Sequence, residues 1–314
     1  MQKYNSILIV GPTASGKSDV AILLAKKLKG EIINTDSMQI YAEMQIGTAR
    51  PTVEEQDKIT HHLFGFIPVD SEYSVSEYRA DAEKVFKEII DRKKIPIFVG
   101  GTGLYAQSLI SNFSYGENTK DEKLRAKYEK LAAEKGKEEV YKKLKKLDPE
   151  AAEKISCNDL KRIIRAIEIY TLSKKKKSEM VEENKAMQTN MQTSIKPLII
   201  GINYPREQLY ERINLRTENM INNGLLDEAQ IIFNKNLPEK SQSLGAIAYK
   251  ELFPYFRKER SLAGCIELLK QKTRNYAKRQ ITWFKKMNVI WFDKSEYKKN
   301  YKIVKKIKKI YKAK

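Results

Sequence analysis

The sequence predicts an α/β fold: a parallel β-sheet flanked by helices, with a helical domain inserted into it. Three observations support this prediction. Short, continuously apolar runs alternate with stretches of helical spacing, glycine-rich or acidic residues follow several of these runs, and a long charged region without apolar runs separates two of them. Continuously apolar strands that alternate with helices are typical of parallel sheets covered on both faces.

The first half of the chain supplies three expected strands and one clear helix. A helix is expected over 19–29, where apolar residues recur at helical spacing. The expected strands are 7–10, 31–34 and 95–99. Ligands bind beyond the carboxyl ends of parallel strands, so the polar or glycine-rich segments after these three strands are expected to face one site.

The second half of the chain interrupts the sheet domain and then resumes it. Residues 114–194 are charged and helical in pattern, whereas 196–203 restore an apolar strand, long helical segments follow to about 287, and 289–292 are a candidate edge strand. The expected organisation is a discontinuous core of 1–113 and 195–293, a helical insertion of 114–194 and a basic C-terminal helix or tail of 294–314. Ten lysines against one glutamate in that last segment suit a solvated helix or one that touches RNA.

Composition narrows the class of protein. Sixty Lys and Arg against forty Asp and Glu give a formal charge of +20, which fits a polyanionic partner or a lysine-rich solvated surface. The two cysteines, Cys157 and Cys265, have no disulfide or zinc-ligand spacing, so a reducing cytoplasm is expected. No signal peptide or membrane span is expected from the N-terminal residues.

A phosphate-binding loop follows the first expected strand and opens the first expected helix. The segment matches the Walker A pattern in full, which favours a P-loop NTPase-like fold. Backbone N–H groups of such a loop cradle phosphates, Lys17 supplies a positive charge and the Ser18 hydroxyl is a ligand for Mg²⁺. Its residues are Gly11, Pro12, Thr13, Ala14, Ser15, Gly16, Lys17 and Ser18. The loop recognises a diphosphate or longer chain without indicating whose phosphates they are.

Two further segments lie at strand ends. Asp36 follows the second strand, where it suits a general base equally with a helix cap or an acid linked to Mg²⁺. Thr102 lies in the glycine-rich turn 100–103 after the third strand, where a tight strand-to-helix turn is the alternative. Beyond the phosphate loop, the sequence has no apolar strand that ends in paired acids to activate a hydrolytic water.

Taken together, these segments resemble the bacterial tRNA dimethylallyltransferases, also called tRNA isopentenyltransferases. The resemblance runs from Ile7 to about Phe284. It is carried by Gly-Pro-Thr-Ala-Ser-Gly-Lys-Ser at 11–18, Asp-Ser-Met-Gln-Ile-Tyr at 36–41, Ile-Gly-Thr-Ala-Arg-Pro at 46–51, His-His-Leu at 61–63, Val-Gly-Gly-Thr-Gly-Leu-Tyr at 99–105, the stretch 158–168, and Tyr-Ala-Lys-Arg-Gln-Ile-Thr-Trp-Phe at 276–284. Several motifs in order are more specific than any one alone.

The resemblance implies a reaction and assigns roles in it to particular residues. The donor is dimethylallyl diphosphate, and the acceptor is N6 of the adenosine 3′ of the anticodon in tRNAs that read U-initial codons. Diphosphate leaves readily only when its growing charge is neutralised, which suits the phosphate loop, Lys17 and Mg²⁺. Arg216, and with it Arg212, resembles the family's phosphate-binding arginine, although a surface helix pair is the alternative. Asp36 is the expected base for the amine proton, and Thr102 is expected beside the reacting adenine.

The insertion and several basic or loop residues are expected to contact tRNA. The tRNA contacts that the resemblance implies are Asp36, Ser37, Met38, Gln39, Thr102, Arg125, Lys161, Arg162, Ile163, Ile164, Arg165, Lys278 and Arg279. Trp283 is expected in the core, and His61 and His62 are expected to be structural. A monomer without membrane contact is expected.

Three other functions remain open from the sequence. A nucleotide or shikimate-type kinase would consume ATP at the same loop, and an adenylate isopentenyltransferase would prenylate free AMP. An RNA-binding protein with a degenerate phosphate loop is the non-enzymatic alternative, against which the intact Lys17-Ser18 pair argues.

Overall fold

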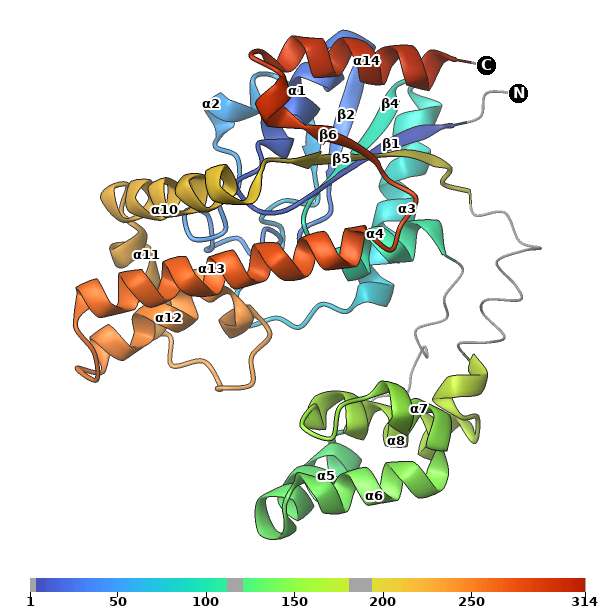
Figure 1. The fold of residues 1–314 in the computed structure, drawn as a ribbon, viewed down its shortest axis with the longest axis vertical. Helices are drawn as coiled ribbons and strands as arrows, with labels where there is room; N and C mark the ends of the chain where they lie inside the picture. Colours follow the sequence, from blue (N-terminus) through green and yellow to red (C-terminus); the bar gives the residue numbers. More distant parts are fainter. Residues whose placement is uncertain (1–3, 112–120, 181–193, 314) are drawn as a thin grey trace. The chain divides into compact units, whose positions relative to one another are not determined.

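The computed structural model describes residues 4–111, 121–180 and 194–313, which belong to two compact units (Figure 1). One unit comprises 1–110 and 194–314, and the other comprises 111–193. The expected boundary between residues 113 and 114 lies outside the described residues.

The first unit is built on a six-stranded sheet in the order β3-β2-β4-β1-β5-β6, with every neighbouring pair parallel. The strands are β1 (Ser6–Val10), β2 (Gly30–Asn34), β3 (His61–His62), β4 (Ile95–Val99), β5 (Pro197–Asn203) and β6 (Ile290–Asp293). The predicted α/β class with a parallel sheet is therefore confirmed. Strand β3 was not predicted, because a two-residue strand of histidines has no apolar run.

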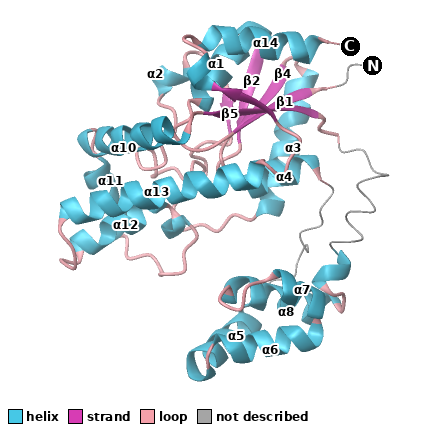
Figure 2. Ribbon diagram, in the orientation of Figure 1, coloured by secondary structure: helices cyan, strands magenta, loops and turns pink. Residues whose placement is uncertain are grey.

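Helices cover both faces of this sheet (Figure 2). Along β1, Ile7 and Ile9 pack with α1 and α14, whereas Leu8 and Val10 pack with α3 and α4 on the other face. This alternation follows from the two-residue repeat of a strand and explains why both faces had to be apolar. The helices of this unit are α1 (Lys17–Leu28), α2 (Val53–Gln56), α3 (Val75–Asp91), α4 (Gly103–Ile110), α10 (Arg206–Asn222), α11 (Leu225–Asn234), α12 (Ile247–Phe256), α13 (Leu262–Phe284) and α14 (Asn300–Lys312), with short 3₁₀ turns at Ser243–Gly245 and Lys294–Glu296.

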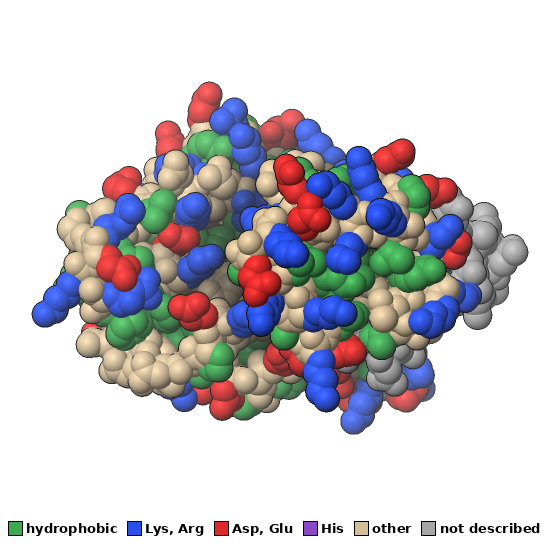
Figure 3. Space-filling view, turned by 90° about the horizontal axis from the view of Figure 1, so that it is seen from below, with side chains coloured by type: hydrophobic (Ala, Val, Ile, Leu, Met, Phe, Trp, Pro, Cys, Tyr) green, Lys and Arg blue, Asp and Glu red, His purple; other side chains and the backbone are tan. Residues whose placement is uncertain are grey.

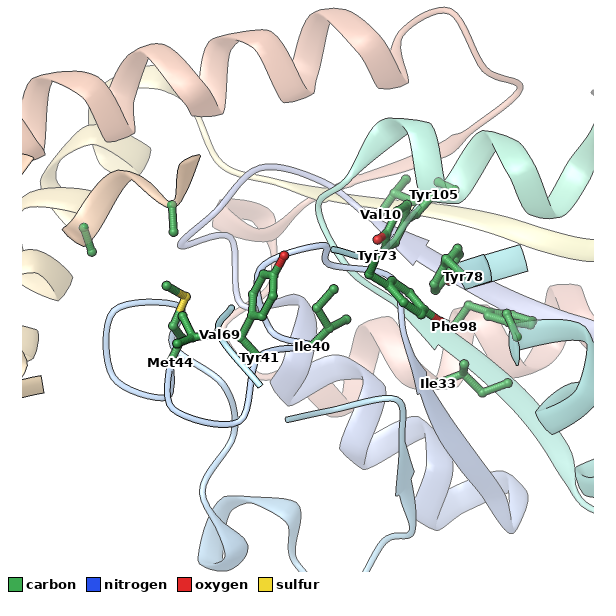
Figure 4. Packing of buried hydrophobic residues seen from close by; sticks show 14 of the residues in the cluster. Val10, Ile33, Ile40, Tyr41, Met44, Val69, Tyr73, Tyr78, Phe98 and Tyr105 are labelled. Carbon is green, nitrogen blue, oxygen red and sulfur yellow. The ribbon is translucent and has the colours of Figure 1, made fainter. Parts of the chain in front are cut away.

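A pair of stacked tyrosines anchors the carboxyl end of β2. The rings of Tyr78 on α3 and Tyr105 on α4 stack with their centroids 3.9 Å apart, inside the apolar cluster of Figure 4. The Tyr78 hydroxyl donates a 2.9 Å hydrogen bond to the carbonyl of Asn34, the last residue of β2. The start of the loop at Thr35 is therefore fixed by a hydrogen bond from the core.

The lysine-rich C-terminal segment contains a helix that packs on the core. Ile303, Val304, Ile307 and Tyr311 of α14 are buried in the cluster that contains α1, and most of the lysines of α14 lie on its exposed side. This spacing gives an amphipathic helix whose apolar stripe is covered.

The second unit is a small helical bundle of α5 (Glu122–Lys135), α6 (Lys137–Leu147), α7 (Pro149–Lys154) and α8 (Leu160–Ser173). Val140 and Leu144 of α6 pack with Ile163 and Ile167 of α8 in its core. A stretch of helical periodicity without apolar runs produces such a bundle, since each helix needs one covered face.

Charged side chains are spread over the surface. Figure 3 shows lysine and arginine side chains across one face, with Asp and Glu side chains among them. Among the described residues, no helix is long and apolar enough to cross a membrane.

Candidate active site

The three loops that follow β1, β2 and β4 line one cavity of about 320 Å³. Thr13, Lys17 and Ser18 come from the first loop and the start of α1, Asp36 from the second, and Gly101 from the third. We call this space the central cavity. Parallel strands present their carboxyl ends at one edge of a sheet, which is why residues far apart in sequence meet here.

The phosphate loop is shaped by glycine and supported from outside. Gly11 has φ 144°, and a Cβ there would overlap the carbonyl of Ile202 on β5, so only glycine lets the loop pass this close to the sheet. Arg212 donates from Nε to the Ala14 carbonyl at 2.9 Å, and its guanidinium lies over the ring of Tyr204. Arg212 therefore supports the loop from outside, and its expected contact with the donor stays a prediction.

Lys17 and Arg216 bring two positive charges to the same side of the cavity. Lys17 donates from Nζ to the Pro12 carbonyl at 2.7 Å, and Arg216 donates from Nη1 to the Thr13 hydroxyl at 3.0 Å. Burial and the neighbouring Arg216 lower the pKa of Lys17 to about 7, and the Asp36 carboxylate only partly opposes them. Burial also lowers the pKa of Arg216. Two cations held at such a cost in desolvation are poised for an anionic ligand.

The loops after β2 and β4 are locked to each other. A Cβ at Gly100 would overlap the backbone of Thr35, and the Thr102 N–H donates to the Thr35 carbonyl at 3.1 Å. The Ser37 N–H donates to the Thr102 hydroxyl at 2.9 Å, and that hydroxyl donates to Ser37 Oγ at 3.1 Å. Thr102 thus positions the Asp36-Ser37 turn.

One oxygen of the Asp36 carboxylate accepts a hydrogen bond from its own turn, and the other lies toward the glycine turn 100–103. Oδ1 accepts the Met38 N–H at 3.0 Å, as in an Asx turn, and Oδ2 lies on the side of Gly101. No helix begins at Asp36, so it is not a helix cap. Its charge acts on Lys17, Arg216 and the phenol of Tyr276.

Gln280 on α13 was not predicted as a site residue, yet it joins two of the loops. Its Oε1 accepts the Thr13 N–H at 2.8 Å, and its Nε2 donates to the Gly101 carbonyl at 2.9 Å. The side chain is buried and lines the central cavity. Gln280 lies within the motif at 276–284 that carries the resemblance, which was the sequence signal that could have identified it.

Glu228 on α11 was also missed, and it holds one wall of the cavity. Its carboxylate accepts three consecutive N–H groups, from Gln45, Ile46 and Gly47, each at 2.9 Å, and the Tyr249 hydroxyl at 2.7 Å. Gly47, Thr48 and Ala49 line the cavity.

Gln39, which is predicted to contact RNA, lines the cavity and ties this wall to the loop after β2. Its Nε2 donates to the carbonyls of Thr48 and Ala49.

Apolar side chains share the cavity with these polar groups. They come from α10, from α13 and from the segment that opens α12, and they are Ile213, Met220, Leu269, Ala246, Ile247 and Ala248. The cavity therefore offers cations at the phosphate loop together with an apolar wall.

The predicted RNA contacts divide into exposed and enclosed groups. Lys161 and Arg162 of α8 and Lys278 and Arg279 of α13 are exposed, and Arg279 also lines the central cavity. Ser37 and Met38 line the cavity as well.

The prediction of side-chain contacts from Ile163 and Ile164 is wrong, because both are buried in the core of the bundle.

Arg125 and Arg165 are engaged within the bundle by the buried Glu168. Arg125 donates to Glu168 Oε1 at 2.8 Å, and Arg165 donates to Oε2 at 2.6 Å. Burial alone would raise the pKa of Glu168, but hydrogen bonds from Arg125, the Asp121 N–H and Arg165 lower it. These two arginines stabilise the bundle first, whatever else they contact.

The two histidines and Trp283 were predicted to be structural. His62 Nε2 pairs with Glu31 Oε2 at 2.6 Å, at the end of the sheet away from the loops, whereas His61 lines the cavity. The prediction for Trp283 is wrong, since 36% of its surface is exposed.

The Ser18 hydroxyl is the candidate ligand for a divalent cation in the cavity, and the Asp36 carboxylate is a second oxygen group of suitable chemistry there. The Ser18 side chain lines the cavity beside Lys17, and the described residues hold no group of three or more His, Cys, Asp or Glu side chains able to bind a metal. Mg²⁺ commonly takes one or two protein oxygens and completes its shell with water and phosphate oxygens. The residues present fit a cation that arrives with a diphosphate.

Comparison with known proteins agrees with this geometry. The model of the family described as IPP transferase matches residues 39–287. A tRNA dimethylallyltransferase of Acetivibrio thermocellus is 45% identical over 97% of this chain and 96% of its own length, and one of Bacillus anthracis is 43% identical over 97% and 95%.

Solved structures give the same result. A tRNA isopentenylpyrophosphate transferase of Staphylococcus epidermidis is 40% identical with a TM-score of 0.70, over 97% of this chain and 98% of that one. A eukaryotic dimethylallyltransferase acting on tRNA is 30% identical with a TM-score of 0.80, over 95% and 76%. These relatives confirm the P-loop NTPase-like fold, and the chain belongs to the IPP transferase family.

Proposed function

We propose that this protein transfers the dimethylallyl group of dimethylallyl diphosphate to N6 of the adenosine 3′ of the anticodon in tRNAs that read U-initial codons, and releases diphosphate. The observation that carries the proposal is the mixed character of the central cavity. A phosphate loop with Lys17 and Arg216 opens into a space walled by apolar residues such as Ile213 and Met220. A short prenyl diphosphate has the same two halves.

The residues suggest how the donor is activated. Breaking the carbon–oxygen bond places growing negative charge on the diphosphate, which the loop N–H groups, Lys17 and Arg216 stabilise where it develops. Mg²⁺ held through Ser18 and the diphosphate oxygens would supply further neutralisation when bound. Gln280 keeps the phosphate loop in register with the Gly101 turn.

The acceptor needs a base, because the lone pair of the adenine amine is delocalised into the ring. Asp36 is the proposed base, with Oδ2 on the side of Gly101 and Oδ1 held by the Met38 N–H. As the new carbon–nitrogen bond forms, the N6 proton passes to the Asp36 carboxylate. Thr102 fixes the turn that carries Asp36. Extraction of the adenine from its stack costs a few kcal/mol, which binding must offset.

On the insertion unit, the exposed cations Lys161 and Arg162 are proposed to contact tRNA. On the other unit, the exposed cations Lys278 and Arg279 of α13 are proposed to do so. We further propose that the enzyme acts in the cytoplasm as a monomer.

The test is label transfer. Protein, Mg²⁺, radiolabelled dimethylallyl diphosphate and unmodified tRNA should yield labelled tRNA, and mapping of the nucleoside should place the label on the expected adenosine. Consumption of ATP without labelled tRNA would favour a kinase, and label on free AMP but not on tRNA would favour an adenylate isopentenyltransferase.

A further inference from the structure

An exposed apolar ledge lies where α13 packs against the start of α4. It consists of Trp283 on α13, with 36% of its surface exposed, and Leu104 on α4, with 40% exposed. The indole lies directly against Gly103, where a Cβ would overlap it. Phe284, the next residue, is buried in the core, so α13 holds the indole rigidly at the surface.

This ledge continues the acceptor side of the central cavity. Trp283 lies one turn along α13 from Arg279 and Gln280, which both line the cavity. Helix residues three or four apart have Cβ atoms about 5–6 Å apart. The turn that leads into α4 has the same order: Gly101 lines the cavity, Thr102 binds the Asp36 turn, and Leu104 near the start of α4 is exposed. Along both segments the ledge is therefore the next exposed surface after residues that line the cavity or support it.

The charges around the ledge indicate the chemistry of its occupant. Lys278, Arg279, Lys285 and Lys286 are all exposed on or just after the same part of α13. An exposed indole among cations is the arrangement that binds single-stranded nucleic acid, in which bases stack on aromatic rings while cations neutralise phosphates.

We propose that Trp283, supported by Leu104, stacks on the unpaired nucleobase adjacent to the acceptor adenine. The inference rests on the proposed function and adds a contact that holds the RNA chain once the adenine has left its stack. When the acceptor adenine is extracted, the neighbouring base loses a stacking partner. Stacking on Trp283 replaces part of the free energy lost in this way. Trp283 is thus assigned to RNA positioning, away from the donor.

The test uses an unmodified anticodon stem-loop RNA and the full-length protein. Loss of one base–aromatic stack corresponds to about a 5- to 150-fold weaker affinity. Trp283→Ala should raise the dissociation constant and KM of the stem-loop within that range and leave KM for dimethylallyl diphosphate unchanged. Trp283→Phe should recover part of the loss. Tyr301→Ala is the matched control, since Tyr301 is 55% exposed on α14, which packs on the opposite face of the sheet, and should change neither constant.

Abasic substitutions on either side of the acceptor adenine identify the stacked base. One of the two should weaken binding to the wild-type protein and have little further effect on Trp283→Ala. Equal losses in both proteins at both positions would overturn the proposal, as would a Trp283→Ala protein that binds RNA normally.

Fluorescence provides a readout that does not depend on activity. Only Trp283 and Trp291 are present in the chain, so Trp291→Phe leaves Trp283 as the single tryptophan. Saturable quenching by the stem-loop is expected, and none would contradict the stack. If the wild-type protein transfers no label to tRNA, the proposed function fails, whereas a normal transfer rate without quenching defeats only the ledge. A wild-type dimer that Trp283→Ala converts to a monomer would assign the ledge to a second copy of the chain and overturn the proposal.

Discussion

Gln280→Met should separate the phosphate loop from the Gly101 turn without changing the volume of the side chain. The native amide accepts from Thr13 at 2.8 Å and donates to Gly101 at 2.9 Å, and it is 5% exposed. Two neutral hydrogen bonds contribute about 1 kcal/mol each, and leaving their partners buried and unpaired raises the total to about 2–4 kcal/mol. If half of this serves transition-state geometry, kcat/KM falls by about 5- to 30-fold.

The assay is single-turnover transfer from dimethylallyl diphosphate to tRNA, with urea unfolding measured in parallel. Gln280→Glu is the informative partner variant, because a carboxylate still accepts from the Thr13 N–H but cannot donate to the Gly101 carbonyl. We expect Gln280→Met and Gln280→Glu both to slow transfer and Gln280→Glu to be the slower, since its charge faces the donor diphosphate and Asp36. A kcat/KM within twofold of wild type for Gln280→Met would refute the assignment of a bridging role.

Three other predictions follow from the geometry of the cavity. Glu228→Ala removes an acceptor of three backbone N–H groups and should lower the free energy of unfolding by about 2–4 kcal/mol, as measured by urea denaturation. It should also raise the KM for the donor. Unchanged stability would contradict the proposed role of Glu228 in holding the cavity wall. Burial lowers the pKa of Lys17 from 10.5 to about 7, so with rising pH the folded protein loses this proton before the unfolded chain does. The free energy of unfolding should therefore rise with pH from about 7 toward 10.5. Lys17→Met should abolish this rise when unfolding is measured as a function of pH. Donor binding at pH 8 should accordingly take up a proton, and calorimetric heats that are independent of the buffer would contradict this. Ser18→Ala should raise the Mg²⁺ concentration needed for half-maximal transfer, and an unchanged metal dependence would remove Ser18 from the metal site.

The parts of the fold that follow local rules were predictable from the sequence. Strands β1 and β4 are mainly apolar runs, β2 is a shorter apolar pair between Glu31 and Asn34, and each of the three leads into the polar or glycine-rich segment that reaches the cavity. The phosphate loop was predictable as well, because its sequence pattern reflects the backbone conformation of the loop itself. Strand β3 could not be predicted in this way, because it is a two-residue edge strand that pairs with β2 and has no apolar run.

The residues that sequence reasoning missed act across long separations. Gln280 bonds to Thr13 at a distance of 267 positions, and Glu228 bonds to Gln45 at 183 positions. Neither partner is visible from local spacing, and an isolated Gln or Glu on a helix is usually a solvated residue.

Trp283 was misplaced for a related reason. The side of α13 that packs inward is set by contacts with other helices. It includes Phe284 and Gln280, whereas Trp283 packs against Gly103 and keeps 36% of its surface exposed. Aromatic content alone predicts burial, whereas the tertiary structure decides which face of the helix is covered.

The central claim is that Asp36 removes the acceptor proton while the phosphate loop holds the donor. The most direct measurement is the single-turnover rate of Asp36→Asn, because Asn keeps an acceptor for the Met38 N–H and so preserves the turn. Positioned general bases contribute about 10²- to 10⁴-fold, so transfer should slow by that factor while the affinities for dimethylallyl diphosphate and tRNA stay close to wild type. Asp36→Ala should slow transfer at least as much. A transfer rate near that of the wild-type protein in either variant would contradict the account.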